Sequence, residues 1–116
     1  MSRTILILSR KIIKPAEGFT SRVQLTEYVN NLSELAKSRN GFIKSDSYWN
    51  QSINNNDFSE VIETISISEW KNMESWNSWK NSTERNRLNN QYKNILESEK
   101  FSILQKKTPT DDIFLL

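Results

Sequence analysis

The chain has 116 residues and a net charge of +2 from 16 basic and 14 acidic residues, and it contains neither cysteine nor histidine. This length favours one domain, and the composition excludes disulfides, thiolate metal sites, and the commonest general base and haem ligand. The charges are interspersed, without the basic clustering of a phosphate-binding surface. We therefore expect no metal, no cofactor and no nucleic-acid partner.

Residues 3–13 are predicted to form the first strand. Ile5 and Ile7 would point to one face, and Leu6 and Leu8 to the other. A strand that is apolar on both faces needs cover on both faces. Four apolar residues are too few for a signal-peptide core or a membrane span, so we expect a cytoplasmic protein without a membrane partner.

Residues 21–38 are predicted to form a helix. Ser21 with Gln24 fits a capping box, and Asn40-Gly41 is a suitable end because glycine adopts the left-handed conformation without strain. Apolar residues recur at three- and four-residue steps and form one stripe: Leu25, Tyr28, Val29, Leu32, Leu35 and Ala36.

Residues 42–53 and 59–70 are predicted to form an antiparallel hairpin around a polar turn at 54–57. Simple alternation assigns the large side chains of the first strand to opposite faces, Phe42 and Tyr48 to one and Ile43 and Trp49 to the other. In the second strand it places Val61, Ile65 and Ile67 opposite Ile62 and Trp70.

The remaining elements are two helices and a strand. Asn72 is the expected N-cap of a short helix whose Met73, Trp76 and Trp79 face the sheet. Ser82 is the expected N-cap of a second helix that extends to Leu96. Residues 101–106 read as the last strand.

The element order β-α-β-β-α-α-β predicts an α+β fold, with one antiparallel sheet and helices on one face. We expect residues 1–107 to form a single domain and residues 108–116 to form a C-terminal tail with an apolar end.

Three tryptophans carry the most information about family. Trp70 ends a strand in a Glu-Trp pair, Asn72 then opens the short helix with Trp76 and Trp79, and Ser82 precedes the next helix. This pattern resembles the antibiotic-biosynthesis-monooxygenase family among the dimeric α+β barrel proteins. The resemblance implies a ferredoxin-like subunit whose open sheet face packs against a second chain. We therefore expect a homodimer in which the tail reaches the partner.

The resemblance also implies an activity. Quinol and polyketide oxygenases of this family need no metal or flavin, because the phenolic substrate itself reacts with oxygen in a dry pocket. Arg85 could stabilise a phenolate or enolate, and Glu63 could act as the base if it faces inward. The full set of pocket candidates is Trp79, Asn89, Ser9, Arg85, Tyr92, Tyr48 and Glu63. Each also has an ordinary structural interpretation, as core for the tryptophan and as surface or interface for the polar residues.

Haem degradation is not expected. In the haem-degrading relatives, the tryptophan at the position of Trp79 works with a histidine roughly three turns further on and an asparagine on the first strand. Here those positions fall at Asn89 and near Ser9, and a neutral amide is a poor iron ligand.

The sequence also bears on two further functions. A non-catalytic barrel that binds a small apolar ligand, or has a structural role, fits the same pattern. A pocket filled by Trp76, Trp79 and Tyr92 would favour it, whereas converging polar groups would favour an enzyme. RNA-recognition domains share the element order, but the residues after Gly41-Phe42 do not continue their sheet motif.

Overall fold

The structure is a computed structural model that describes residues 4–13, 18–50 and 62–105, without the side chains of residues 18–21. The expected turn at 54–57 and the tail at 108–116 lie outside the described residues.

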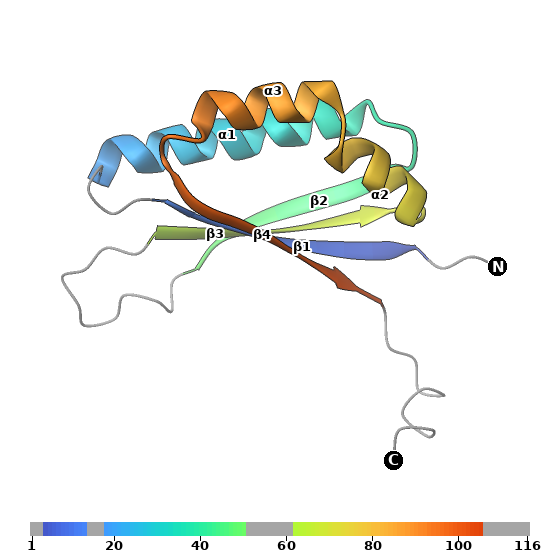
Figure 1. Ribbon diagram of the computed structural model, residues 1–116. Coiled ribbons are helices and arrows are strands. Elements are labelled where there is room, and N and C mark those ends of the chain that lie inside the picture. Colours follow the sequence, from blue (N-terminus) through green and yellow to red (C-terminus); the bar gives the residue numbers. More distant parts are fainter. Residues whose placement is uncertain (1–3, 14–17, 51–61, 106–116) are drawn as a thin grey trace, which may run out of the picture.

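One antiparallel sheet and three helices make up the described part of the chain (Figure 1). The strands lie side by side in the order β2-β3-β1-β4, and the helices cover one face, as the sequence predicted. In chain order the elements are β1 (Ile5–Ile13), α1 (Gly18–Lys37), β2 (Phe42–Trp49), β3 (Ile62–Trp70), α2 (Met73–Lys80), α3 (Thr83–Tyr92) and β4 (Leu96–Leu104).

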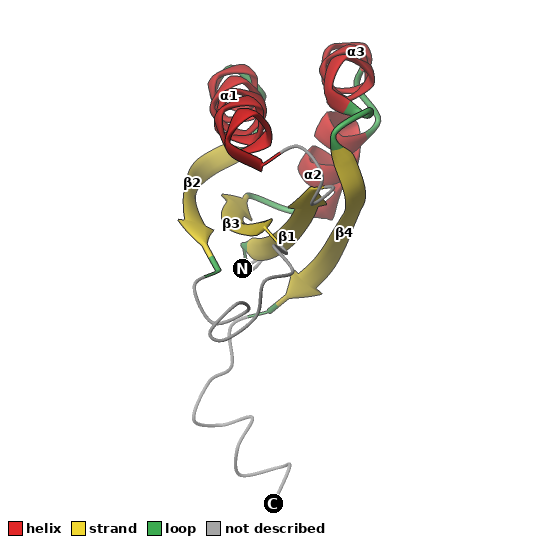
Figure 2. Cartoon of the chain, turned by 90° about the vertical axis from the view of Figure 1, so that its left-hand side faces the viewer, coloured by secondary structure: helices red, strands yellow, loops and turns green. Residues whose placement is uncertain are grey.

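The core lies between the sheet and the helices. Figure 2 shows the sheet curving, so that β2 and β4 rise toward α1 and α3. Leu25 and Tyr28 of α1 and Trp70 of β3 are completely buried there. The apolar stripe predicted for α1 therefore faces the sheet. None of the helices in the described ranges is long and apolar enough to cross a membrane.

The predicted N-caps of α2 and α3 are confirmed. The backbone N–H of Ser75 donates to Oδ1 of Asn72 at 2.9 Å, and that of Arg85 donates to Oγ of Ser82 at 3.2 Å. Each cap satisfies a backbone donor that has no partner inside its helix. The caps fix where α2 and α3 begin, and so fix the direction of their tryptophan and arginine side chains.

The predicted start of the first helix is wrong, since α1 begins at Gly18 and Ser21 lies inside it. Ser21 therefore does not occupy the N-cap position that a capping box requires. A glycine can be accommodated in the first turn of a helix, although its flexibility weakens a helix interior.

The predicted faces of β2 are also wrong. The pairing with β3 is irregular between Phe42 and Lys44, where Ile43 is the extra residue. Such a bulge shifts the alternation by one position. Phe42 and Trp49 consequently share the helix-covered face, and Tyr48 points to the opposite face.

The largest error concerns the boundary between α3 and β4. The helix ends at Tyr92, and the strand already begins at Leu96, which pairs with Ile13. The sequence Glu97-Ser98-Glu99-Lys100 has little strand propensity. Its pairing with β1 and the ion pairs of Glu99 outweigh that local preference.

The sheet face away from the helices is partly apolar. Its central side chains are Leu6, Leu8 and Ile12 of β1 and Ile65 and Ile67 of β3, all half-buried. Around them lie charged residues, including Asp46 and Glu69.

Gly41 is required where α1 turns into β2. Its φ is +89°, and a Cβ atom there would lie 2.1 Å from Oγ of Ser75. Its carbonyl also accepts the backbone N–H of Lys71 at 2.7 Å, which ties this turn to the loop before α2.

Gly41→Ala should therefore lower the free energy of unfolding by about 1–3 kcal/mol, because the new side chain meets both backbone strain and Ser75. Urea denaturation measures the effect, with the exposed neighbour Asn40→Ala as the matched control. Equal midpoints for Gly41→Ala and the unchanged protein would contradict this account of the turn.

Candidate functional site

A cavity of about 60 Å³ lies between the sheet and the helices. The sheet forms its floor with hydroxyl groups and one lysine, α1 contributes small and aliphatic side chains, and the end near α2 is aromatic. The lining residues are Ile7, Ser9, Lys11, Val29, Leu32, Ser33, Ala36, Phe42, Ser45, Ser47, Ser66, Ser68, Trp70, Trp76, Trp79, Arg85 and Phe101. A mainly apolar hollow with a few convergent polar groups is typical of small-molecule sites.

The aromatic wall of the cavity is a cluster of packed rings. The rings of Trp70 and Trp79 are stacked at 6.3 Å, and Trp76 meets Trp70 edge-on at 5.9 Å. Phe42 and Phe101 extend the cluster at 5.3 and 5.2 Å. The indole N–H of Trp70 donates to Ser68 at 2.9 Å, so its polar edge is satisfied in the core.

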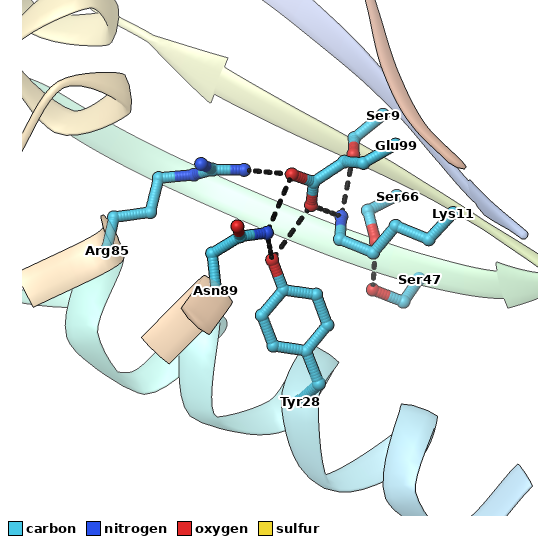
Figure 3. A network of polar contacts seen from close by, with 8 residues as sticks. All are labelled: Ser9, Lys11, Tyr28, Ser47, Ser66, Arg85, Asn89 and Glu99. Carbon is cyan, nitrogen blue, oxygen red and sulfur yellow. Dashed lines mark hydrogen bonds and ion pairs between the residues drawn. The ribbon is translucent and has the colours of Figure 1, made fainter. Parts of the chain in front are cut away.

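Beside this wall, the carboxylate of Glu99 in β4 lies next to four hydrogen-bond donor or cationic groups from three other elements (Figure 3). Oε1 accepts from Arg85 of α3 at 2.8 Å and from Asn89 at 3.4 Å. Oε2 accepts from the hydroxyl of Tyr28 at 3.0 Å and lies 3.6 Å from the ammonium of Lys11. Asn89 also donates to the hydroxyl of Tyr28 at 2.9 Å.

These groups carry two positive charges and one negative charge in a nearly dry environment. Lys11 and Arg85 are only 3% and 6% exposed. Burial is the main cause that lowers the pKa of Lys11; Glu99 opposes the shift and nearby Arg85 adds to it, and the net pKa is about 8. Burial also raises the pKa of Tyr28, so its hydroxyl stays protonated.

Glu99 remains ionised. Burial by itself would raise its pKa, but Lys11 and Arg85 outweigh burial and hold that pKa below its usual value. A carboxylate between two cations and a phenol donor can accept and return a proton within this group.

Hydroxyl groups continue the polar side of the cavity along the sheet. Lys11 donates to Ser9 at 2.6 Å, and Ser47 and Ser66 share a hydrogen bond of 2.8 Å. Within the described ranges, Oγ1 of Thr64 is the single buried side-chain polar atom without a partner. Thr64 lines a second hollow of about 180 Å³, which shares Ser47 and Val29 with the first.

Five of the seven residues proposed from the sequence lie on this side of the sheet. Trp79, Ser9 and Arg85 line the cavity, and Asn89 joins the hydrogen-bond network behind it. Tyr92 does not line the cavity but packs its ring on that of Tyr28 at 5.1 Å.

The structure does not bring Tyr48 and Glu63 to the cavity. Tyr48 lies on the opposite face, 55% exposed, because of the bulge in β2. Glu63 also faces away, since it alternates with Ile62 and Thr64. Its carboxylate is instead buried against Arg10 and Asn50, each at 2.7 Å.

Sequence reasoning missed Lys11, Tyr28 and Glu99. Lys11 was detectable, because a cation at an inward position of a strand as apolar as β1 must find a buried partner. The spacing of Tyr28 places it in an apolar stripe and gives no sign of the role of its hydroxyl. Glu99 lies in a segment with little strand propensity, which hides its inward position.

The buried lysine should make stability depend on pH. Between about pH 8 and pH 10 the unfolded chain still binds a proton that folded Lys11 has released, so stability rises with pH in this window. Above it, the raised pKa of Tyr28 acts in the opposite direction, because the folded state then keeps a proton that the unfolded chain loses.

Lys11→Met should remove this rise and increase stability at neutral pH by an amount on the order of 1–3 kcal/mol. Arg85 still pairs with Glu99 in that variant. Denaturation at a series of pH values measures it, and the exposed Lys37→Met is the control. If the stability of Lys11→Met still rises with pH in this window, another titrating group causes the rise.

The sequence and the fold can be compared with those of known proteins. No family model and no curated protein matches the sequence. Among solved structures, a putative antibiotic biosynthesis monooxygenase from Nitrosomonas europaea is similar, with a TM-score of 0.72 at 11% identity over 94% of this chain and 95% of that chain. SnoaB, a cofactor-independent oxygenase from Streptomyces nogalater, has a TM-score of 0.67 at 7% identity over 92% and 96%.

A third similar structure, PA3566 from Pseudomonas aeruginosa, has a TM-score of 0.69 at 15% identity over 93% of this chain and 98% of that chain. At such identities the likeness establishes the fold. The chain therefore has the fold of the antibiotic-biosynthesis-monooxygenase-like proteins, the resemblance that its three tryptophans predicted.

Proposed function

We propose that this protein is a cofactor-independent oxygenase that acts on a small, electron-rich phenol or polyketide-like compound. The observation that carries the proposal is the cavity itself, where an aromatic wall meets the buried cations Lys11 and Arg85. The likeness to SnoaB, described as a cofactor-independent oxygenase, supports the same reaction class.

The substrate supplies the electrons in this reaction. Lys11, in its neutral form, takes the phenolic proton, and Arg85 stabilises the phenolate. The phenolate passes an electron to O₂, and the two radicals join as a peroxide at a ring carbon. The ammonium of Lys11 then returns the proton and gives the hydroperoxide. Loss of water then leaves a quinone, so that a phenol and O₂ give a quinone and H₂O.

The size of the cavity favours a second candidate, a protein that binds a small ligand without turnover. An apolar cavity of about 150 Å³ accommodates benzene, whereas the hollow here is about 60 Å³. Trp70, Trp76 and Trp79 occupy much of the remaining space. A phenol needs the adjoining hollow of about 180 Å³ as well, or a shift of one of these rings.

Oxygen uptake with simple hydroquinones, measured with a chelator present, tests the oxygenase proposal. The protein should accelerate uptake above the spontaneous rate, and Lys11→Met should reduce that acceleration about 100-fold or more, because it removes the base. Lys37→Met should leave it unchanged. Saturable quenching of tryptophan fluorescence by the hydroquinone without any uptake would instead select the non-catalytic alternative.

We also propose that the protein is a homodimer in which the two sheets pack together through the faces that the helices do not cover. The half-buried stripe of Leu6, Leu8, Ile65 and Ile67 supports this arrangement, since burial of such a patch contributes favourable free energy. The neighbouring Tyr48 is 55% exposed in the single chain, and Leu104 37%.

Ile67→Glu should dissociate the dimer, because it places a charge in the middle of the apolar stripe. Sedimentation at micromolar concentration measures the change, and Asn77→Glu on the exposed side of α2 is the matched control. A monomer in the unchanged protein, or a dimer that survives Ile67→Glu, would argue against this interface.

A further inference from the structure

Lys11 has a chemical capacity that oxygenation does not use. We propose that Lys11 is a nucleophilic amine that captures a small aldehyde or ketone as an imine, and that the cavity is therefore a carbonyl-binding site. This activity goes beyond the oxygenase proposal and does not depend on it.

The first support is the position of the amine. Lys11 arises from the centre of the sheet, lines the cavity and is 3% exposed. Its side chain runs along β1 toward Ser9, and Nζ donates to Oγ of Ser9 at 2.6 Å (Figure 3). Ser9 lines the same cavity. A carbonyl compound in the cavity would thus meet an amine that is almost fully buried.

The second support is the set of charges that face the amine. Glu99 of β4 approaches Nζ at 3.6 Å, whereas Arg85 of α3 adds a second buried cation. Tyr28 of α1 contributes a neutral phenol, and its ring lies below the ammonium at 5.9 Å. A lysine that is desolvated beside another cation is activated as a nucleophile. Its pKa of about 8 agrees with this.

The third support is a route for the protons. The neutral amine attacks the carbonyl carbon, a C–N bond forms, and the carbonyl oxygen becomes a hydroxyl. That hydroxyl leaves as water when the imine forms, so that amine and carbonyl give imine and H₂O without any redox change. Oε2 of Glu99 lies 3.6 Å from Nζ of Lys11 and accepts from the hydroxyl of Tyr28, so it can relay the two protons that the nitrogen loses, one after the other, to the oxygen that leaves as water.

The cavity restricts which carbonyl compounds fit. Its volume of about 60 Å³ favours compounds of a few heavy atoms. Arg85 of α3 also lines the cavity and would suit a negatively charged group on the ligand. A protonated imine also withdraws electrons from the adjacent carbon, so the site could promote proton removal or bond cleavage there.

Reductive trapping tests the proposal. The native protein is treated briefly with propanal and cyanoborohydride at about pH 7.5, without any phenol, and labelled peptides are quantified by mass spectrometry. At that pH about a quarter of Lys11 is neutral, against roughly one in a thousand for an ordinary lysine. We expect Lys11 to be labelled at least about tenfold faster than Lys37, which is exposed and paired with Glu34.

Two comparisons make the result decisive. In protein denatured with urea, Lys11 and Lys37 should be labelled at equal rates, which shows that both peptides are detected. Arg85→Met should slow the labelling of Lys11 severalfold, because loss of the neighbouring cation raises the pKa of the amine. Labelling of native Lys11 no faster than Lys37 would overturn the proposal, whatever the oxygen-uptake result.

Discussion

The pairing of β1 with β4 is the constraint on which the site depends. In this register Lys11 lies opposite Glu99, and Ser9 lies opposite Phe101. A shift of β4 by one residue would turn Glu99 and Phe101 to the other face. The charge pair and the Phe101 side of the cavity therefore depend on the same register. The buried ion pair fits a role in specifying register, a use for which such pairs are better suited than for stability.

The second constraint is the contrast between the two halves of the covered sheet face. One end is filled by tryptophan and phenylalanine rings, whereas the middle carries small hydroxyl side chains such as Ser47, Ser66 and Ser68. Serines leave space above the sheet that larger residues would fill, and their hydroxyl groups keep that space polar. The hollow thus results from small side chains under α1, and the packed tryptophans define where it ends.

The same features account for both chemical proposals. Burial makes the excess positive charge of this cluster expensive, so it lowers the pKa of Lys11 and supports a neutral amine close to physiological pH. Such an amine can act as a base toward a phenol or as a nucleophile toward a carbonyl. Glu99 is the one carboxylate among the described residues of this cluster. Lys11 and Arg85 hold its pKa below the usual value and so keep it ionised.

The sequence by itself determined the element order, the two helix caps, the glycine at the end of α1 and the inward tryptophans, because each depends on neighbours within a few residues. It also indicated Ser9, Arg85 and Trp79 as pocket residues, through the family pattern around Trp70. The bulge at Ile43 and the strand at 96–100 were decided only by tertiary structure, since strand pairing there overrides local propensity. The union of Lys11, Tyr28 and Glu99 likewise required the fold, because contacts across 71 positions of sequence leave no local signal.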